Sequence, residues 1–242
     1  MGVLSGKGAV VTGGSRGIGR AIVERLARDG AQVVFSYRSQ AEAAERVAAA
    51  TGAHAVQADL AGKEDLERLF AAAEAVLPGL DILVNNAATG GPRSIADTTD
   101  DDYEHVMAVN ARAVFIAMRW AARTMRDGGR IINISTLNTA LAVPGVAVYA
   151  ASKAAVERFA MVAARELGGR GITVNSVSPG AVDTELLRST NPPEALERMP
   201  ELTALGRIGR PADIADVVAF LAGPDGRWLT GQNLRATGGL LL

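Results

Sequence analysis

The stretch GAVVTGGSRGIG, residues 8–19, decides the fold. Residues 8–14 are an apolar run that predicts a β-strand entering a glycine turn, and apolar residues then recur at helical spacing from Ile18 to Leu26. Glycines let such a turn bend sharply and approach a pyrophosphate closely, while the helix N-terminus offers unpaired N–H groups to the anion. A tight turn without a ligand is the alternative. The residues predicted to bind a dinucleotide here are Gly13, Ser15, Arg16, Gly17, Ile18 and Gly19.

Short apolar runs and helical patterns alternate along the rest of the chain. Further strands are predicted at 31–37, 53–60, 80–86, 129–135, 171–180 and 229–239, and helices at 17–29, 40–50, 63–77, 100–125, 149–167 and 211–223. This alternation predicts a Rossmann-type α/β fold, a doubly wound parallel sheet of about seven strands with helices on both faces. Because no linker or repeat interrupts the pattern, residues 1–242 are predicted to form one domain. Its irregular segment 185–205 is expected to act as a flap over the substrate.

Composition and charge exclude several classes of function. The net charge is −1 with both signs interspersed, which is not the basic face of a nucleic-acid-binding protein. The chain has no cysteine, and its two histidines, His54 and His105, lack metal-ligand spacing. The N-terminal residues lack the pattern of a secretory signal. No apolar run reaches the length of a membrane-spanning helix, which is about 18 residues. We therefore expect a soluble, cytoplasmic protein without a metal, a nucleic-acid partner or a membrane contact.

The end of the second predicted strand indicates which dinucleotide is bound. NAD-binding proteins usually place an acidic residue there, about 20 residues beyond the glycines, to hold the ribose 2′-hydroxyl. This chain has Ser36, Tyr37, Arg38 and Ser39, and no carboxylate before Glu42. Arginine binds phosphate by charge and by forked hydrogen bonds, so these residues together with the arginine of the glycine turn favour NADP(H) over NAD(H). The alternative is that both arginines are solvated surface residues.

Tyr149 and Lys153 lie four residues apart in YAASK, on one face of a predicted helix. Moving the pKa of a tyrosine from about 10 to about 7 needs roughly 4 kcal/mol of preference for the phenolate. A unit positive charge at about 4 Å supplies about that much at an effective dielectric constant near 20. The pair can therefore form a general acid/base near neutral pH. A tyrosine that only packs on its neighbours is the alternative, but the position after the fifth strand favours a ligand crevice.

Over essentially its whole length the chain resembles the short-chain dehydrogenases/reductases, and among them the 3-oxoacyl-ACP-reductase-like and ketoreductase-like members. The motifs that carry the resemblance are the turn 12–19, Asp59, NNAA at 85–88, Asn110, NIST at 133–136, the Tyr149/Lys153 pair and SPGAVDT at 178–184. Their combination is far more specific than any one of them.

The resemblance implies hydride transfer between NADP(H) and a ketone or secondary alcohol. Tyr149 would donate a proton to the carbonyl oxygen, Lys153 would lower the pKa of Tyr149 and hold the nicotinamide ribose, and Asn110 would hold a water of the proton relay. Asp59 and Leu60 would border the adenine, and Thr184 would touch the carboxamide. The remaining residues implied in cofactor binding are Asn86, Ala87, Ala88, Tyr149, Pro179, Gly180 and Val182.

Two residues depart from the family's pattern. The catalytic serine normally stands thirteen residues before the tyrosine, where this chain has Thr136, and Ser135 lies one place early. Neighbouring residues of a strand face opposite ways, so we expect Thr136 to meet the carbonyl oxygen, although a loop shift could bring in Ser135 instead. Ala88 replaces the glycine of NNAG, which would strain the backbone if that position needs a positive φ.

The substrate is only broadly constrained by the sequence. The candidates for its pocket are mostly apolar and suit a ketone or alcohol with an uncharged body, although they could equally pack in the core: Leu137, Asn138, Pro144, Val146, Leu186, Leu187 and Met199. The resemblance suggests a 3-oxoacyl thioester, a polyketide-like ketone or a cyclic ketone. The rival functions are a non-catalytic dinucleotide-binding regulator and an epimerase or dehydratase on the same scaffold.

Two predicted helices, 101–125 and 151–168, carry apolar residues on more than one face. A helix that is apolar nearly all round is buried on all sides. We therefore expect a homotetramer or a homodimer, with burial under loops of the same chain as the alternative.

Overall fold

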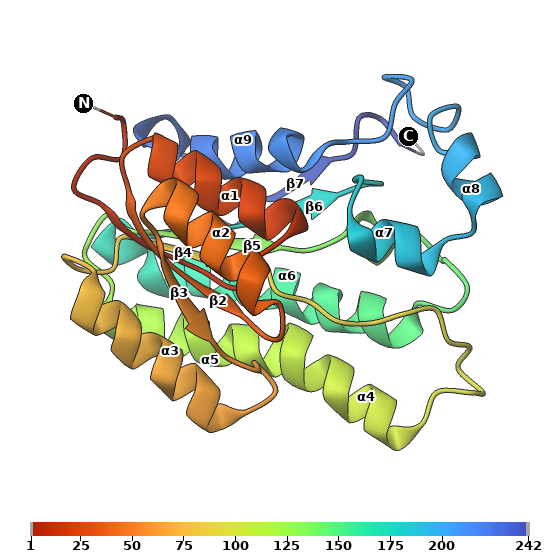
Figure 1. Cartoon of the computed structure of the whole chain (residues 1–242), viewed down its shortest axis with the longest axis horizontal. Coiled ribbons are helices and arrows are strands. Elements are labelled where there is room, and N and C mark those ends of the chain that lie inside the picture. Colours follow the sequence, from red (N-terminus) through yellow and green to blue (C-terminus); the bar gives the residue numbers. More distant parts are fainter. Residues whose placement is uncertain (1, 241–242) are drawn as a thin grey trace.

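Seven β-strands form one sheet in this computed structural model, which describes residues 2–240. They follow the order β3-β2-β1-β4-β5-β6-β7 across the sheet, and every pairing is parallel. This confirms the predicted doubly wound sheet (Figure 1). The strands are β1 Gly8–Val11, β2 Gln32–Tyr37, β3 His54–Gln57, β4 Ile82–Asn85, β5 Arg130–Ile134, β6 Thr173–Pro179 and β7 Asn233–Ala236.

Helices cover both faces of the sheet (Figure 1). They are α1 Gly17–Arg28, α2 Ala41–Thr51, α3 Lys63–Val76, α4 Asp100–Met107, α5 Ala113–Thr124, α6 Ala147–Leu167, α7 Glu185–Thr190, α8 Pro193–Arg198 and α9 Pro211–Ala222. Successive residues of β1 alternate between the two layers. Val10 packs in the apolar cluster of α3, α5 and α6, whereas Ala9 and Val11 pack in that of α1, α2 and α9. A strand buried on both faces is apolar throughout, which explains the unbroken apolar runs of the sequence.

The direction in which the chain crosses the sheet reverses between β1 and β4. These strands are neighbours, with Val11 paired to Val84, and the chain moves outward from them to β3 on one side and to β7 on the other. In such sheets the ligand crevice lies at the carboxyl ends of the strands where the order reverses. The fold therefore places the site beyond Val11 and Asn85, where the glycine turn and the NNAA motif begin.

Two predicted helix boundaries are wrong in detail. The helix expected over 100–125 consists of α4 and α5 joined by a π-helical turn, η1 (Ala108–Arg112), whose widened ring joins the Ala113 N–H to the Ala108 carbonyl. Helix α6 begins two residues before Tyr149 rather than at it. The segment 184–209 was expected to be irregular with short helical pieces, and the short helices α7 and α8 confirm this.

The apolar residues of α5 and α6 divide between the interior and the surface. Val114, Met118 and Val156 are buried within the chain's own core, which accounts for part of the pattern without a second subunit. Phe115 and Met161 remain about half exposed, at 48% and 47%. Contact with another subunit stays a prediction.

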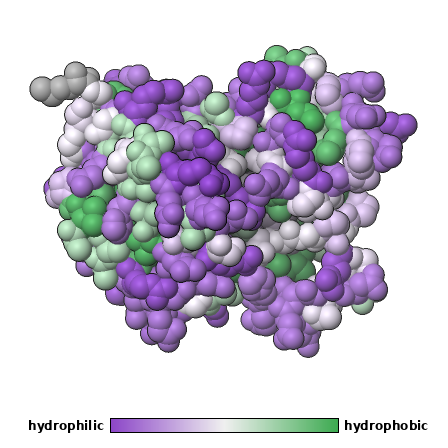
Figure 2. Space-filling model, viewed as in Figure 1, coloured by the Kyte–Doolittle hydropathy of each residue, from purple (hydrophilic) through white to green (hydrophobic). Residues whose placement is uncertain are grey.

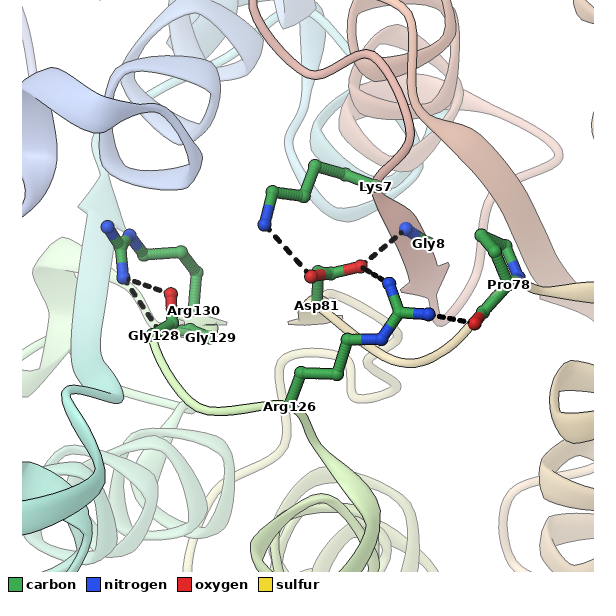
Figure 3. A network of polar contacts seen from close by, with 8 residues as sticks. All are labelled: Lys7, Gly8, Pro78, Asp81, Arg126, Gly128, Gly129 and Arg130. Carbon is green, nitrogen blue, oxygen red and sulfur yellow. Dashed lines mark hydrogen bonds and ion pairs between the residues drawn. The ribbon is translucent and has the colours of Figure 1, made fainter.

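A network of charged groups closes the opposite, amino-terminal edge of the sheet (Figure 3). The carboxylate of Asp81, which directly precedes β4, is buried and accepts hydrogen bonds from the Gly8 N–H at 2.9 Å, the Lys7 ammonium at 3.0 Å and the Arg126 guanidinium at 3.3 Å. Arg126 also bonds the Pro78 carbonyl. One carboxylate thus joins the start of β1 to the start of β4 and to the segment before β5.

Asp81→Asn should lower the free energy of unfolding by about 2–3 kcal/mol, because a buried, charge-assisted hydrogen-bond acceptor is lost while its donors remain. Urea unfolding measures the change. Asp225→Asn is the matched control, since Asp225 is exposed and forms no ion pair within residues 2–240. Equal stabilities of the two variants would contradict a structural role for this network.

Candidate active site

The glycine turn is fastened to the end of β4 by side-chain hydrogen bonds. Thr12 Oγ1 accepts from the N–H groups of Asn86 and Ala87 at 2.9 and 3.1 Å. The Asn86 amide in turn donates to the carbonyls of Thr12 and Gly13 at 2.9 and 3.1 Å. Asn86 therefore holds the turn in place from the neighbouring strand, which is a bracing contact that the sequence did not reveal.

Two glycines of the turn are required by the geometry around them. Gly13 has φ of 71°, a left-handed conformation that favours glycine. A Cβ on Gly19 would lie 2.0 Å from the Gly13 carbonyl oxygen, so only glycine lets α1 pack this closely against the turn. The N-cap of α1, Arg16, makes no side-chain capping bond. The first N–H groups of α1 thus remain open to an anion, which fits the predicted pyrophosphate site.

Two arginines lie where a 2′-phosphate is expected. Arg38 is exposed just beyond β2, and Tyr37 and Ser39 flank it without a carboxylate. Arg16 is also exposed, and its guanidinium forms an ion pair with Glu185 Oε2 at 2.5 Å. Glu185 is the first residue of α7. The sequence predicted both arginines but not the ion pair, because residues 169 positions apart give no local signal.

The predicted adenine-side and ribose-side residues gather at the same edge. Asp59 follows β3 and its Oδ1 accepts from the Ala61 N–H at 3.0 Å, while Leu60 is buried. The effect of Ala88 on the local backbone stays a prediction.

Residues after β6 reach back to the glycine turn. The Gly180 N–H bonds the Ala236 carbonyl at 3.3 Å, and Val182 is buried in a bridge with Gly209. Thr184 caps α7 by accepting from the Leu187 N–H at 3.2 Å. The Thr184 methyl group also lies beside Gly17 of the glycine turn, 3.4 Å from the position that a Cβ on Gly17 would occupy. The segment Pro179 to Thr184 thus borders the same crevice as the turn.

The flap expected over 185–205 contains α7 and α8 and presents apolar surface to solvent at one end of the molecule (Figure 2). Its exposed leucines are Leu186, Leu202 and Leu205. The C-terminal segment holds its far end, since the Leu205 N–H donates to the Gly238 carbonyl at 3.1 Å. The movement of a flap over substrate stays a prediction.

The structure separates the two hydroxyls of the NIST motif. Ser135 is buried and donates to Glu157 Oε1 at 2.6 Å, which directs its hydroxyl to the side of α6. Thr136 Oγ1 accepts from the Asn138 N–H at 3.3 Å, and the Thr136 side chain is the polar group whose influence lowers the pKa of the Tyr149 phenol. The arrangement places Thr136, not Ser135, beside the tyrosine.

Burial raises the pKa of Tyr149 above its ordinary value, and the hydrogen bond with Thr136 opposes that shift only in part. This direction is opposite to the one expected from the neighbouring ammonium. The simple Coulomb argument omits the cost of moving the phenolate out of water, and that cost is the largest influence here. The chain's own groups therefore keep the phenol protonated at neutral pH, which is the form that can donate a proton.

Lys153 is 2% exposed, and burial lowers its pKa to about 8. Its ammonium donates to the Ile134 carbonyl at 2.8 Å, the only hydrogen bond it makes within residues 2–240. An ammonium has three donors, so two remain for a ligand. Two free ammonium donors suit the hydroxyl groups of a ribose, which can accept hydrogen bonds.

Asn110 lies in the π-helical turn and is completely buried. Its Oδ1 accepts from the Thr89 N–H at 2.8 Å, and its Nδ2 donates to the Thr89 carbonyl at 2.8 Å and to Ser152 Oγ at 3.1 Å. The side chain thereby ties the residue after NNAA to α6. Both hydrogens of the Asn110 amide are donated to protein groups. A water of the predicted proton relay could therefore bond this side chain only by donating to the second lone pair of Oδ1.

A pocket of about 260 Å³ opens beside Tyr149. Its wall is more polar than expected, since it includes His105 and the ion pair of Arg93 with Asp102, whose atoms are 3.0 Å apart. Gly90 also lines it, and a Cβ there would come within 3.1 Å of the tyrosine ring. None of the apolar candidates expected at the substrate lines this pocket.

The part of the chain that the structure describes contains no group of three or more acidic, histidine or cysteine side chains arranged to hold a metal ion. Within the same residues no helix is both long and apolar enough to cross a membrane.

Comparisons with known proteins extend over the whole chain. A family model described as Enoyl-(Acyl carrier protein) reductase matches residues 13–241. The chain is 39% identical to the NADPH-dependent aldehyde reductase-like protein, chloroplastic, of Arabidopsis thaliana, over 98% of this chain and 94% of the relative. It is 40% identical to the cyclic-di-GMP-binding biofilm dispersal mediator protein of Escherichia coli strain K12, over 96% of this chain and 95% of the relative.

Among solved structures, the chain is similar to the angucycline C-6 ketoreductase LanV with bound NADP. The TM-score is 0.93 at 43% identity, covering 99% of this chain and 97% of that one. The seven-stranded parallel sheet agrees with these likenesses. The chain belongs to the short-chain dehydrogenase/reductase family of oxidoreductases.

Proposed function

We propose that the protein reduces a ketone to a secondary alcohol with NADPH. The observation that supports the proposal most is the position of Tyr149, Thr136 and the buried Lys153 ammonium near the carboxyl end of β5. The names of the Arabidopsis aldehyde reductase-like relative and of the ketoreductase with bound NADP support the direction and the cofactor.

The residues present fit NADP(H). The uncapped start of α1 would hold the pyrophosphate, Arg16 and Arg38 the 2′-phosphate, and the Lys153 ammonium the nicotinamide ribose. When bound, the cofactor supplies the hydride. Thr136 would bind the carbonyl oxygen and Tyr149 would give it a proton as negative charge develops there.

A product-identified screen of ketones tests the proposal. Titrating NADPH by fluorescence should show binding, and a substrate should consume NADPH and yield one equivalent of alcohol. Binding without consumption across a broad panel would contradict the proposal.

The rival, a dinucleotide-binding regulator without turnover, is favoured by one observation, the likeness to the cyclic-di-GMP-binding mediator of E. coli. The same titration separates the two functions. A regulator would bind cyclic-di-GMP in competition with NADPH or alone, and would convert no ketone. An epimerase or dehydratase would convert its substrate without net consumption of NADPH.

Thr136→Ala should lower kcat/KM for ketone reduction by about 10- to 100-fold, because one hydrogen bond to the developing oxyanion is lost. Thr136→Ser should retain or raise the wild-type value, since the hydroxyl stays and a methyl group leaves the pocket. Steady-state kinetics measure both. Thr124→Ala, at the exposed end of α5, is the matched control. Wild-type activity of Thr136→Ala would show that Thr136 is not the partner of the carbonyl.

A further inference from the structure

Three hydroxyl groups converge on one carboxylate oxygen beneath the site. Glu157 lies on α6 one turn after Lys153, and its Oε1 accepts from Ser135 at 2.6 Å and Thr139 at 2.8 Å. Ser178 Oγ lies 3.3 Å from the same oxygen and donates at 2.7 Å to Asn233 Oδ1. The three hydroxyls come from the end of β5, from the short turn η2 (Leu137–Thr139) and from β6. One side chain therefore joins three segments that border the crevice.

These contacts enclose Thr136. On one side of it, Lys153 holds the Ile134 carbonyl and Glu157 holds the Ser135 hydroxyl. On the other side, Thr139 donates toward Glu157 and also lies 3.0 Å from the Thr136 carbonyl. The backbone around Thr136 is thus tied at both ends to α6, the helix that carries Tyr149.

The position of Glu157 does not serve to neutralise a positive charge. Glu157 forms no ion pair within residues 2–240, and the groups that approach its Oε1 there are hydroxyls, two of them from the buried Ser135 and Ser178. Hydroxyls give a carboxylate short, directional bonds without neutralising it. Such an arrangement contributes geometry rather than charge balance.

We propose that Glu157 is a positioning residue, which holds the segment 135–139 so that Thr136 faces Tyr149 at the distance needed to bind a carbonyl oxygen between them. This inference rests on the proposed function as a carbonyl reductase. Glu157 itself touches neither substrate nor cofactor and acts only through Thr136.

A double-mutant cycle tests it. Glu157→Gln, which keeps the shape but weakens acceptance of the hydroxyls, should lower kcat for ketone reduction about tenfold and leave the Kd for NADPH within twofold. In a Thr136→Ala background the same substitution should cause no further loss, because the group it positions is gone. Thr139→Val, which removes one donor, should follow the same pattern with a smaller loss. An equal loss in both backgrounds would overturn the proposal in favour of a general structural role.

Hydrogen exchange of the protein alone gives a second measurement that needs no substrate. In Glu157→Gln the amides of 136–140 should exchange several-fold faster, whereas Glu166→Gln, an exposed site on the same helix, should match wild type. Unchanged exchange would overturn the proposal even if turnover fell. If the wild type reduces no ketone, the proposed function fails, and the exchange measurement still decides whether Glu157 holds this segment.

Discussion

Replacing Tyr149 by phenylalanine should lower kcat for ketone reduction by about 10³-fold, the usual size of a lost general acid. The phenol is the group proposed to donate the proton, and burial raises its pKa, so it is protonated at neutral pH. Phenylalanine fills the same space beside Gly90 and Thr136. The loss of activity would therefore report the missing proton donor and not a change in packing.

Single-turnover and steady-state kinetics measure the effect, and NADPH titration shows whether the cofactor site survives. The Kd for NADPH should stay within twofold, because the predicted cofactor contacts at the glycine turn are untouched. Tyr103→Phe, at an exposed tyrosine of α4, is the matched control and should leave kcat unchanged. Retention of more than about a tenth of wild-type turnover in Tyr149→Phe would exclude the tyrosine as the acid.

Arg38→Asp should reverse the preference for NADPH over NADH, with a shift in the ratio of the two kcat/KM values on the order of 100-fold. The guanidinium that would bind the 2′-phosphate is replaced by a carboxylate, which repels the phosphate and accepts a hydrogen bond from a free 2′-hydroxyl. Arg38 is the cleaner position to change, since Arg16 is already engaged by Glu185.

Kinetics with both cofactors measure the ratio, and Arg123→Asp supplies the control. That arginine is exposed near the end of α5, so it experiences the same charge reversal away from the crevice. A ratio that moves as little in Arg38→Asp as in the control would mean that the 2′-phosphate is recognised elsewhere.

The sheet was predictable because its signals are local. The apolar strands, the glycines at 13, 17 and 19 and the helical spacing from Ile18 to Leu26 each express a short-range rule of backbone geometry. The parallel order then follows from the alternation of strands and helices. The positions of the candidate site residues at strand ends follow from the strands for the same reason, whereas the roles of these residues stay predictions.

Long-range contacts were not predictable. Nothing near Glu157 in the sequence indicates that three hydroxyls from other segments meet it, although its spacing of four from Lys153 placed both on one face of α6. The direction of the pKa shift of Tyr149 depends on burial, which only the folded chain determines. The polar wall formed by Arg93, Asp102 and His105 likewise exists only once α4 lies beside the loop that follows β4.

The π-helical turn at 108–112 has a consequence for how this protein can tolerate insertions and deletions. A ring one residue wider than an α-helical turn sets α5 out of phase with α4 by about 100°. Deleting one residue there would give a more regular helix, yet it would rotate Val114 and Met118 out of the core and unseat Asn110. The irregular turn thus sets which faces of α4 and α5 point to the core. We expect an alignment of family sequences to show no insertion or deletion at residues 108–112, although the helix continues through them.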